Sequence, residues 1–102
     1  MRKDKELVLI KQEYKFDELK NQIPYGEPRR KPVLCSESSV SRNEFYSAGN
    51  KGFKPEKVFS IYSFEYDNEA LVEFEGQTYS VIRSYVTSYK DIELTCERNI
   101  GQ

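Results

Sequence analysis

The chain has 102 residues, no histidine and a formal net charge of −1, and these values limit what it does. The length fits one domain, residues 1–102, with one hydrophobic core and no room for a separate cofactor domain. Without histidine, the commonest general base and the commonest transition-metal ligand are missing. The near-neutral charge gives no overall attraction to nucleic acid or to an anionic membrane. We therefore expect no enzymatic activity, no cofactor and no metal site.

The cysteine content and the short apolar runs favour a protein made in the cytoplasm. No segment is long and apolar enough for a bilayer span or a signal peptide, so Cys35 and Cys96 should be reduced thiols. Two cysteines without a histidine cannot complete a structural zinc site. We expect both cysteines to be small, buried apolar residues.

Alternating apolar residues near the N-terminus predict a strand over residues 7–16, followed by a long exposed loop over residues 17–31. The apolar face of this strand carries Val8, Ile10, Tyr14 and Phe16. The loop contains Pro24 and Pro28, which cannot donate to a strand ladder, and it ends in a basic run. A second strand is expected over residues 32–40.

The one helix signal predicts a helix over residues 41–48. Ser41 stands three residues before Glu44, the spacing of a capping box in which each side chain caps a backbone N–H group of the helix start. Gly49 is expected to end the helix in a left-handed conformation. Three apolar side chains are expected to act as staple and core contacts: Val40, Phe45 and Tyr46.

After a basic connector, period-two patterning predicts four more strands, over residues 57–64, 70–75, 78–87 and 91–97. The first of them is apolar enough on both faces to be buried on both sides. The predicted core residues of these strands are Phe59, Ile61, Ala70, Val72, Phe74, Ile92, Leu94 and Cys96. Residues 75–77 are expected to form a tight hairpin turn. The carboxylate pairs Glu73/Glu75 and Asp91/Glu93 alternate with core positions, so they belong to the wet face of the sheet, together with Thr95 and Glu97.

About six short strands, one short helix and long loops predict a mainly β fold, a small antiparallel β-barrel or sandwich. Closure into a barrel removes apolar strand edges that would otherwise aggregate, whereas edges left open serve to be completed by a neighbouring subunit. Basic residues predominate near the N-terminus and acidic residues near the C-terminus. This asymmetry favours head-to-tail contact between copies, or it is ordinary surface charge.

The order of these features resembles the head-closure, or head-tail joining, proteins of long-tailed bacteriophages. The motifs that carry the resemblance are Ser41-Arg42-Asn43-Glu44-Phe45-Tyr46, Lys54-Pro55, Glu65-Tyr66-Asp67, Val72-Glu73-Phe74-Glu75-Gly76-Gln77-Thr78-Tyr79 and Ile92-Glu93-Leu94. They span residues 33–97, whereas residues 1–32 contribute only a first strand and a long loop.

The resemblance implies a structural protein of the virion neck. In that family, about twelve copies form a ring beneath the portal and its adaptor, retain packaged double-stranded DNA in the head and dock the tail. The implied partners are therefore other copies of the chain, the portal-adaptor complex, the tail-end protein and DNA bound without sequence preference. No membrane partner is implied.

Two segments compete for the role of the element that faces the central channel. By the resemblance, residues 41–55 correspond to a loop that reaches into the channel, and Arg42, Lys51, Lys54 and Lys57 would then face DNA phosphates. The alternative is a docked surface helix followed by a loop without such a role. The rival segment, residues 17–31, ends in Arg29, Arg30 and Lys31, and it is equally suited to contact the adaptor or the tail.

Aromatic side chains are the best candidates for contacts between subunits or with the neck. Tyr14, Tyr25, Tyr46 and Tyr89 are predicted to be exposed, and Tyr25, Tyr46 and Phe53 join the basic run as candidate contact residues. Two alternative functions remain: a single-strand nucleic-acid-binding barrel and a generic protein-interaction domain. Against the first, the acidic later strands leave no face that is both basic and aromatic.

Overall fold

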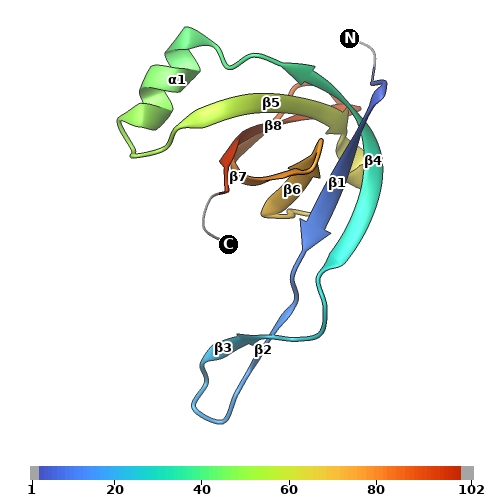
Figure 1. The fold of residues 1–102 in the computed structure, drawn as a ribbon, viewed down its shortest axis with the longest axis vertical. Coiled ribbons are helices and arrows are strands. Elements are labelled where there is room, and N and C mark those ends of the chain that lie inside the picture. Colours follow the sequence, from blue (N-terminus) through green and yellow to red (C-terminus); the bar gives the residue numbers. More distant parts are fainter. Residues whose placement is uncertain (1–2, 100–102) are drawn as a thin grey trace.

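A closed antiparallel barrel forms the body of the protein, whose computed structural model describes residues 3–99 (Figure 1). Its strands are β1 (Lys5–Lys11), β4 (Arg29–Ser38), β5 (Pro55–Tyr62), β6 (Leu71–Phe74), β7 (Gln77–Val86) and β8 (Asp91–Arg98). They follow the order β1-β4-β5-β8-β7-β6 around the barrel, and β6 pairs with β1 to close it. The prediction of a mainly β, antiparallel barrel is confirmed, and the sandwich alternative is excluded.

Four elements of the described residues lie outside the barrel wall. Strands β2 (Tyr14–Phe16) and β3 (Gln22–Pro24) form a separate two-stranded sheet, here called the arm. Helix α1 (Arg42–Gly49) follows β4, and a 3-10 helix, η1 (Ser63–Glu65), follows β5. Figure 1 shows the arm projecting from the barrel at the end of the long axis opposite α1.

Side chains from all six barrel strands fill the interior. The buried core consists of Leu7, Leu9, Val33, Cys35, Phe59, Ile61, Val72, Phe74, Tyr79, Ile92, Leu94 and Cys96. Phe59 lies at its centre, with ring centroids 4.8 Å from Phe74 and 5.9 Å from Tyr79. Most of the core residues predicted from the later strands are confirmed, because strict alternation there leaves one apolar face.

The two cysteines are free thiols and lie in this core, as predicted. Burial raises the pKa of the Cys35 thiol to about 11, with a further contribution from the nearby Glu37 carboxylate. Burial alone raises the pKa of Cys96 to about 12. Both groups are therefore protonated at neutral pH and pack as apolar side chains.

The expected first strand is wrong in length and in its inner face. β1 ends at Lys11, and Leu7 and Leu9, not Val8, are fully buried. Residues 7–10 are all apolar, so the sequence does not specify which alternate pair points inward. In the folded barrel the two leucines do. Beyond β1 the pairing is irregular, because Lys11 pairs with Arg29 but Tyr14 pairs with Pro24. Tyr14 and Phe16 are exposed and lie in β2, which Figure 1 shows outside the barrel.

The predicted loop over residues 17–31 instead contains β3 and the start of β4. Pro24 tolerates a strand because the hydrogen-bonded pairs beside it are Glu13/Tyr25 and Lys15/Ile23, so the N–H that proline lacks would point outward. Pro32 lies in the part of β4 that pairs only with β1. Prolines therefore occupy strand positions here that leave the ladder intact.

The helix prediction is confirmed in position but not in all its details. The Ser41 hydroxyl accepts a hydrogen bond from the Glu44 backbone N–H at 3.1 Å, as a cap should. Gly49 remains helical, and the left-handed glycine is Gly52, with φ of +87°. Tyr46 is 63% exposed, so the expected core contact is wrong.

Several later side chains lie on a different face from the one expected. Ala70 is exposed, and the adjacent Glu69 is buried in its place. Thr95 is buried although it alternates out of the barrel, because α1 covers that part of the outer wall. Tyr62 and Phe64 are exposed, so the expected burial of strand residues 57–64 on both sides is wrong at that end.

The hairpin between β6 and β7 has the predicted tight turn. Phe74 pairs with Gln77, which leaves a loop of two residues. Both loop residues have positive φ, 52° at Glu75 and 80° at Gly76, as in the turns that match strand twist.

Candidate functional site

Of the four cations predicted to face the channel, three are exposed and one already forms an ion pair at the barrel. Arg42 lies in the first turn of α1, and Lys51 and Lys54 lie in the connector to β5; all three are exposed. Lys57 belongs to β5 and forms an ion pair with Glu37. The structure therefore places three of the four cations on the helix and connector, and the fourth at the barrel mouth.

The helix is attached to the barrel through one carboxylate. Glu44 accepts hydrogen bonds from Arg83 at 2.9 Å and from the buried Thr95 hydroxyl at 3.0 Å. The Glu44 side chain therefore reaches the barrel wall instead of returning to Ser41 to complete the capping box. α1 has no fully buried residue, so this polar contact helps to hold the helix in place.

The connector after α1 is short and turns tightly. Lys51 and Phe53 donate backbone hydrogen bonds to the Ala48 carbonyl, at 3.0 and 2.9 Å. Phe53 is 38% exposed and lines a surface groove between α1 and the barrel, together with Glu44 and Arg83. The candidate contact residue Phe53 therefore lies next to the candidate channel-facing lysines.

The basic run of the N-terminal part is in β4, where each cation already has a partner. Arg29 forms an ion pair with Glu13, and Arg30 forms one with Glu73. Lys31 donates to the backbone carbonyl of Glu65. Because their side chains tie β4 to the arm base, β6 and η1, these three residues have structural roles that the sequence pattern did not indicate.

The arm exposes several apolar side chains, which confirms the predicted exposure of Tyr14 and Tyr25 and corrects the predicted inward position of Phe16. Phe16 is 72% exposed and Leu19 is 81% exposed. Tyr14 and Tyr25 are also exposed, and Lys15 lies 5.3 Å from the centre of the Tyr25 ring. The alternation of Tyr14 and Phe16 is visible in the sequence. It does not indicate whether the face that carries them packs against the barrel or is exposed to solvent.

A second exposed aromatic surface surrounds the turn between β7 and β8. Tyr62 and Phe64 stack with ring centroids 5.6 Å apart, and Phe64 is 82% exposed. Tyr89, which is 87% exposed, lies in the β7–β8 turn itself. The serine of η1, Ser63, ties the two together by donating from its hydroxyl to the Tyr89 carbonyl at 3.1 Å.

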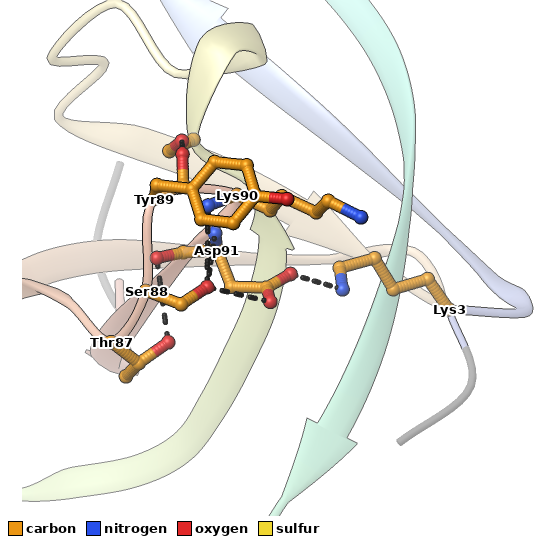
Figure 2. A network of polar contacts seen from close by, with 7 residues as sticks. Lys3, Thr87, Ser88, Tyr89, Lys90 and Asp91 are labelled. Atoms are coloured by element: carbon orange, nitrogen blue, oxygen red, sulfur yellow. Dashed lines mark hydrogen bonds and ion pairs between the residues drawn. The ribbon is translucent and has the colours of Figure 1, made fainter.

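Polar contacts hold this turn rigid. Figure 2 shows Lys3 reaching from the start of the chain to the Asp91 carboxylate. Ser88 donates from its hydroxyl to the same carboxylate at 3.1 Å and accepts from the Asp91 backbone N–H at 3.2 Å. The ion pair and the serine bonds lower the pKa of Asp91 below its usual value. Several polar contacts therefore hold the turn that carries Tyr89, next to Tyr62 and Phe64.

Charged side chains close one mouth of the barrel. Glu37 on β4 lies between Lys5 on β1 and Lys57 on β5, and all three continue the inward alternation of their strands. Both ammonium groups lie about 6 Å from the centre of the buried Phe74 ring. Hydrogen bonds from Lys57 and Lys5 lower the pKa of Glu37.

The opposite part of the interior is covered by the segment after η1. Tyr66 packs against the core and donates from its hydroxyl to the Glu69 carbonyl at 2.8 Å. Burial raises the pKa of Tyr66 to about 12. Lys11, at the end of β1, donates to the Asp67 carboxylate at 2.8 Å. The interior is therefore packed and covered, and the features available for recognition lie on the outside.

Within residues 3–99, no cluster of histidine, cysteine or carboxylate side chains is suited to hold a metal ion. The same described range contains no helix long and apolar enough to cross a membrane. No known protein-family model matches the sequence, and no curated protein matches it.

Proposed function

We propose that the chain is a structural subunit of a phage head-tail connector, forming a ring below the portal and adaptor that closes the DNA-filled head and docks the tail. The observation that carries the proposal is a filled, closed barrel whose exposed apolar side chains gather on the arm and beside the β7–β8 turn. Apolar side chains that cluster on a protein surface mark sites of contact with other molecules. The ordered motifs of residues 33–97, which resemble head-closure proteins, support this assembly in particular.

Mechanical stiffness is the first requirement of such a role, and the barrel supports it. Strand closure leaves few free edges, and the interior is packed to the centre around Phe59. The Lys5-Glu37-Lys57 contacts tie three neighbouring strands at one mouth. We therefore expect each subunit of such a ring to be stiff.

A surface that attracts DNA without reading its sequence is the second requirement. Arg42, Lys51 and Lys54 supply exposed cations on α1 and the connector, and Lys57 contributes less because Glu37 already neutralises it. Repeated around a ring, these charges face phosphates without base contacts. The exposed Tyr46 and Phe53 are then available for contacts with the portal-adaptor complex or the tail.

The rival function is single-strand nucleic-acid binding, and one observation favours it. Cations lie beside exposed tyrosine rings in three places, where Lys15 contacts Tyr25, Arg83 contacts Tyr85 and Lys90 contacts Tyr89. Such pairs are suited to stack and neutralise nucleotides. They are divided between the arm and the β7–β8 hairpin, however, and do not follow one groove.

Mass photometry with and without the portal-adaptor complex separates these functions. We expect the isolated protein to be monomeric or weakly associated, and to add as a ring of about twelve copies when the complex is present. A tight, salt-dependent complex of the isolated protein with single-stranded DNA, and no addition to the portal-adaptor complex, would contradict the connector proposal.

A further inference from the structure

The arm is a two-stranded hairpin that extends the β1–β4 ladder beyond the barrel, where a further strand would stabilise it. Its two strands of three residues pair only with each other among residues 3–99. A lone two-stranded hairpin is at best marginally stable in water. Phe16 and Leu19 expose most of their surface, so folding gains little from burying them. The arm is therefore suited to be completed by a third strand.

One edge of the arm is open to such a strand. Hydrogen bonds from Tyr25 to Glu13 and from Asp17 to Asn21 fix which residues pair across the hairpin. By alternation, the N–H and C=O groups of Tyr14 and Phe16 point outward from β2. On the other edge, Pro24 has no N–H to offer, so β3 is blunted and β2 is the available edge.

A matching free edge lies in the second half of β7. β6 pairs with β7 only as far as Ser80, followed by a hydrogen bond from the Val81 N–H to the Ala70 carbonyl. Beyond it, β7 has β8 as its strand partner within residues 3–99. The hydrogen bond from Thr87 to Asp91 sets the alternation, so the N–H and C=O groups of Ser84 and Val86 point away from β8.

We propose that β2 of one copy adds antiparallel to the β7 edge of the next copy, an inference that rests on the proposed ring for the identity of the partner. The outward groups limit the possible registers, and the one that pairs both residues of β2 within β7 places Tyr14 opposite Val86 and Phe16 opposite Ser84. Each such pair exchanges two hydrogen bonds, which gives about four in all. The apolar side chains Tyr14, Phe16 and Val86 then share one face.

The same register brings complementary side chains together on the other face. Lys15 lies opposite Tyr85, and Asp17 lies opposite Arg83. Tyr85 is 56% exposed and already accepts the Arg83 guanidinium near its ring, at 5.5 Å from the centroid. Because Arg83 already pairs with Glu44, Asp17 would join an existing ion pair, and these side-chain contacts are compatible with the register that the backbone groups favour.

The two surfaces that the contact joins lie at different ends of the molecule, which favours contacts that lead from copy to copy over a reciprocal pair. The arm projects from the end of β1 that is remote from the start of the chain, as Figure 1 shows. The hairpin that holds the β7 edge contacts Lys3, just before β1 begins. A contact between unlike surfaces generates a ring when the rotation closes.

Cysteine cross-linking tests this contact. F16C and S84C variants are mixed at high concentration and oxidised; both positions are exposed, and the native cysteines are fully buried. We expect a disulfide-linked dimer that contains one copy of each variant. The matched control is Q22C mixed with S84C, because Gln22 lies opposite Phe16 on the blunted strand of the same arm. Cross-linking no stronger than in this control, or F16C linking mainly to itself, would overturn the inference.

A double variant, F16C/S84C, extends the test. An unlike contact predicts a ladder of trimers and higher species on non-reducing gels, whereas a two-fold contact would stop at the dimer and contradict the proposal. The result is separable from the connector proposal. Cross-linking without addition to the portal-adaptor complex would support the contact between copies and contradict the neck role. Addition without cross-linking would support the neck role and contradict this contact.

Discussion

Replacing Phe59 by alanine will lower the free energy of unfolding by about 3–5 kcal/mol, the range measured for large aromatic residues in protein cores. Phe59 is fully buried and contacts Phe74 and Tyr79 at the centre of the barrel. The substitution leaves a cavity that the strands, held in register on both sides, cannot collapse to fill. Urea unfolding followed by tyrosine fluorescence measures the change.

The matched control is Phe64→Ala, because Phe64 is 82% exposed. We expect this variant to unfold within about 0.5 kcal/mol of the unsubstituted protein. If Phe59→Ala prevents folding altogether, Phe59→Leu still measures the effect, with an expected loss of about 1–1.5 kcal/mol. Equal losses at positions 59 and 64 would contradict the packed-barrel account.

Reversing the charge of Lys51 and Lys54 together will release DNA from finished heads. Both lysines are exposed on the connector after α1, so Lys51→Glu with Lys54→Glu leaves the core untouched. In a ring, every copy then presents carboxylates where phosphates pass, and the attraction becomes repulsion. We expect a several-fold fall in the fraction of DNA-filled particles, measured by electron microscopy of particles produced from the altered genome.

The charge-conserving variant, Lys51→Arg with Lys54→Arg, is the control and should retain DNA normally. The purified Glu variant should show the same unfolding transition as the unsubstituted protein. Normal DNA retention and full infectivity in the Glu variant would remove these lysines from the channel, and the exposed face of α1 would then serve another contact.

The barrel itself was predictable because its later strands obey strict alternation. Ile92, Leu94 and Cys96 are buried as expected, and the loop at Glu75 and Gly76 is the one that a two-residue hairpin requires. In this half of the chain, the local pattern and the tertiary structure agree. A shift of one residue in the strand register would turn the whole apolar face toward solvent.

The N-terminal half could not be assigned in the same way. Leu7 to Ile10 are all apolar, so alternation does not select a face, and only the barrel decides that Leu7 and Leu9 point inward. The arm was missed because prolines near its strands read as loop signals. Pro24 is compatible with β3 only because its nitrogen faces outward, which depends on the register of the hairpin.

The interaction surfaces depend on contacts between residues far apart in the chain. Glu44 fits a local cap by its spacing, yet its carboxylate binds Arg83 and Thr95 on the barrel wall. Lys57 was predicted to face DNA together with the connector lysines, yet Glu37 holds it at the barrel mouth. Such partners are separated by at least 20 residues, and no spacing rule identifies them.

The most direct measurement of the central claim is the location of this chain in assembled particles, resolved by cryo-electron microscopy. The account predicts a ring of small barrels at the neck, between the portal-adaptor complex and the tail, with an arm from each barrel reaching its neighbour. Barrels found elsewhere in the particle, or particles that are complete without this chain, would contradict it.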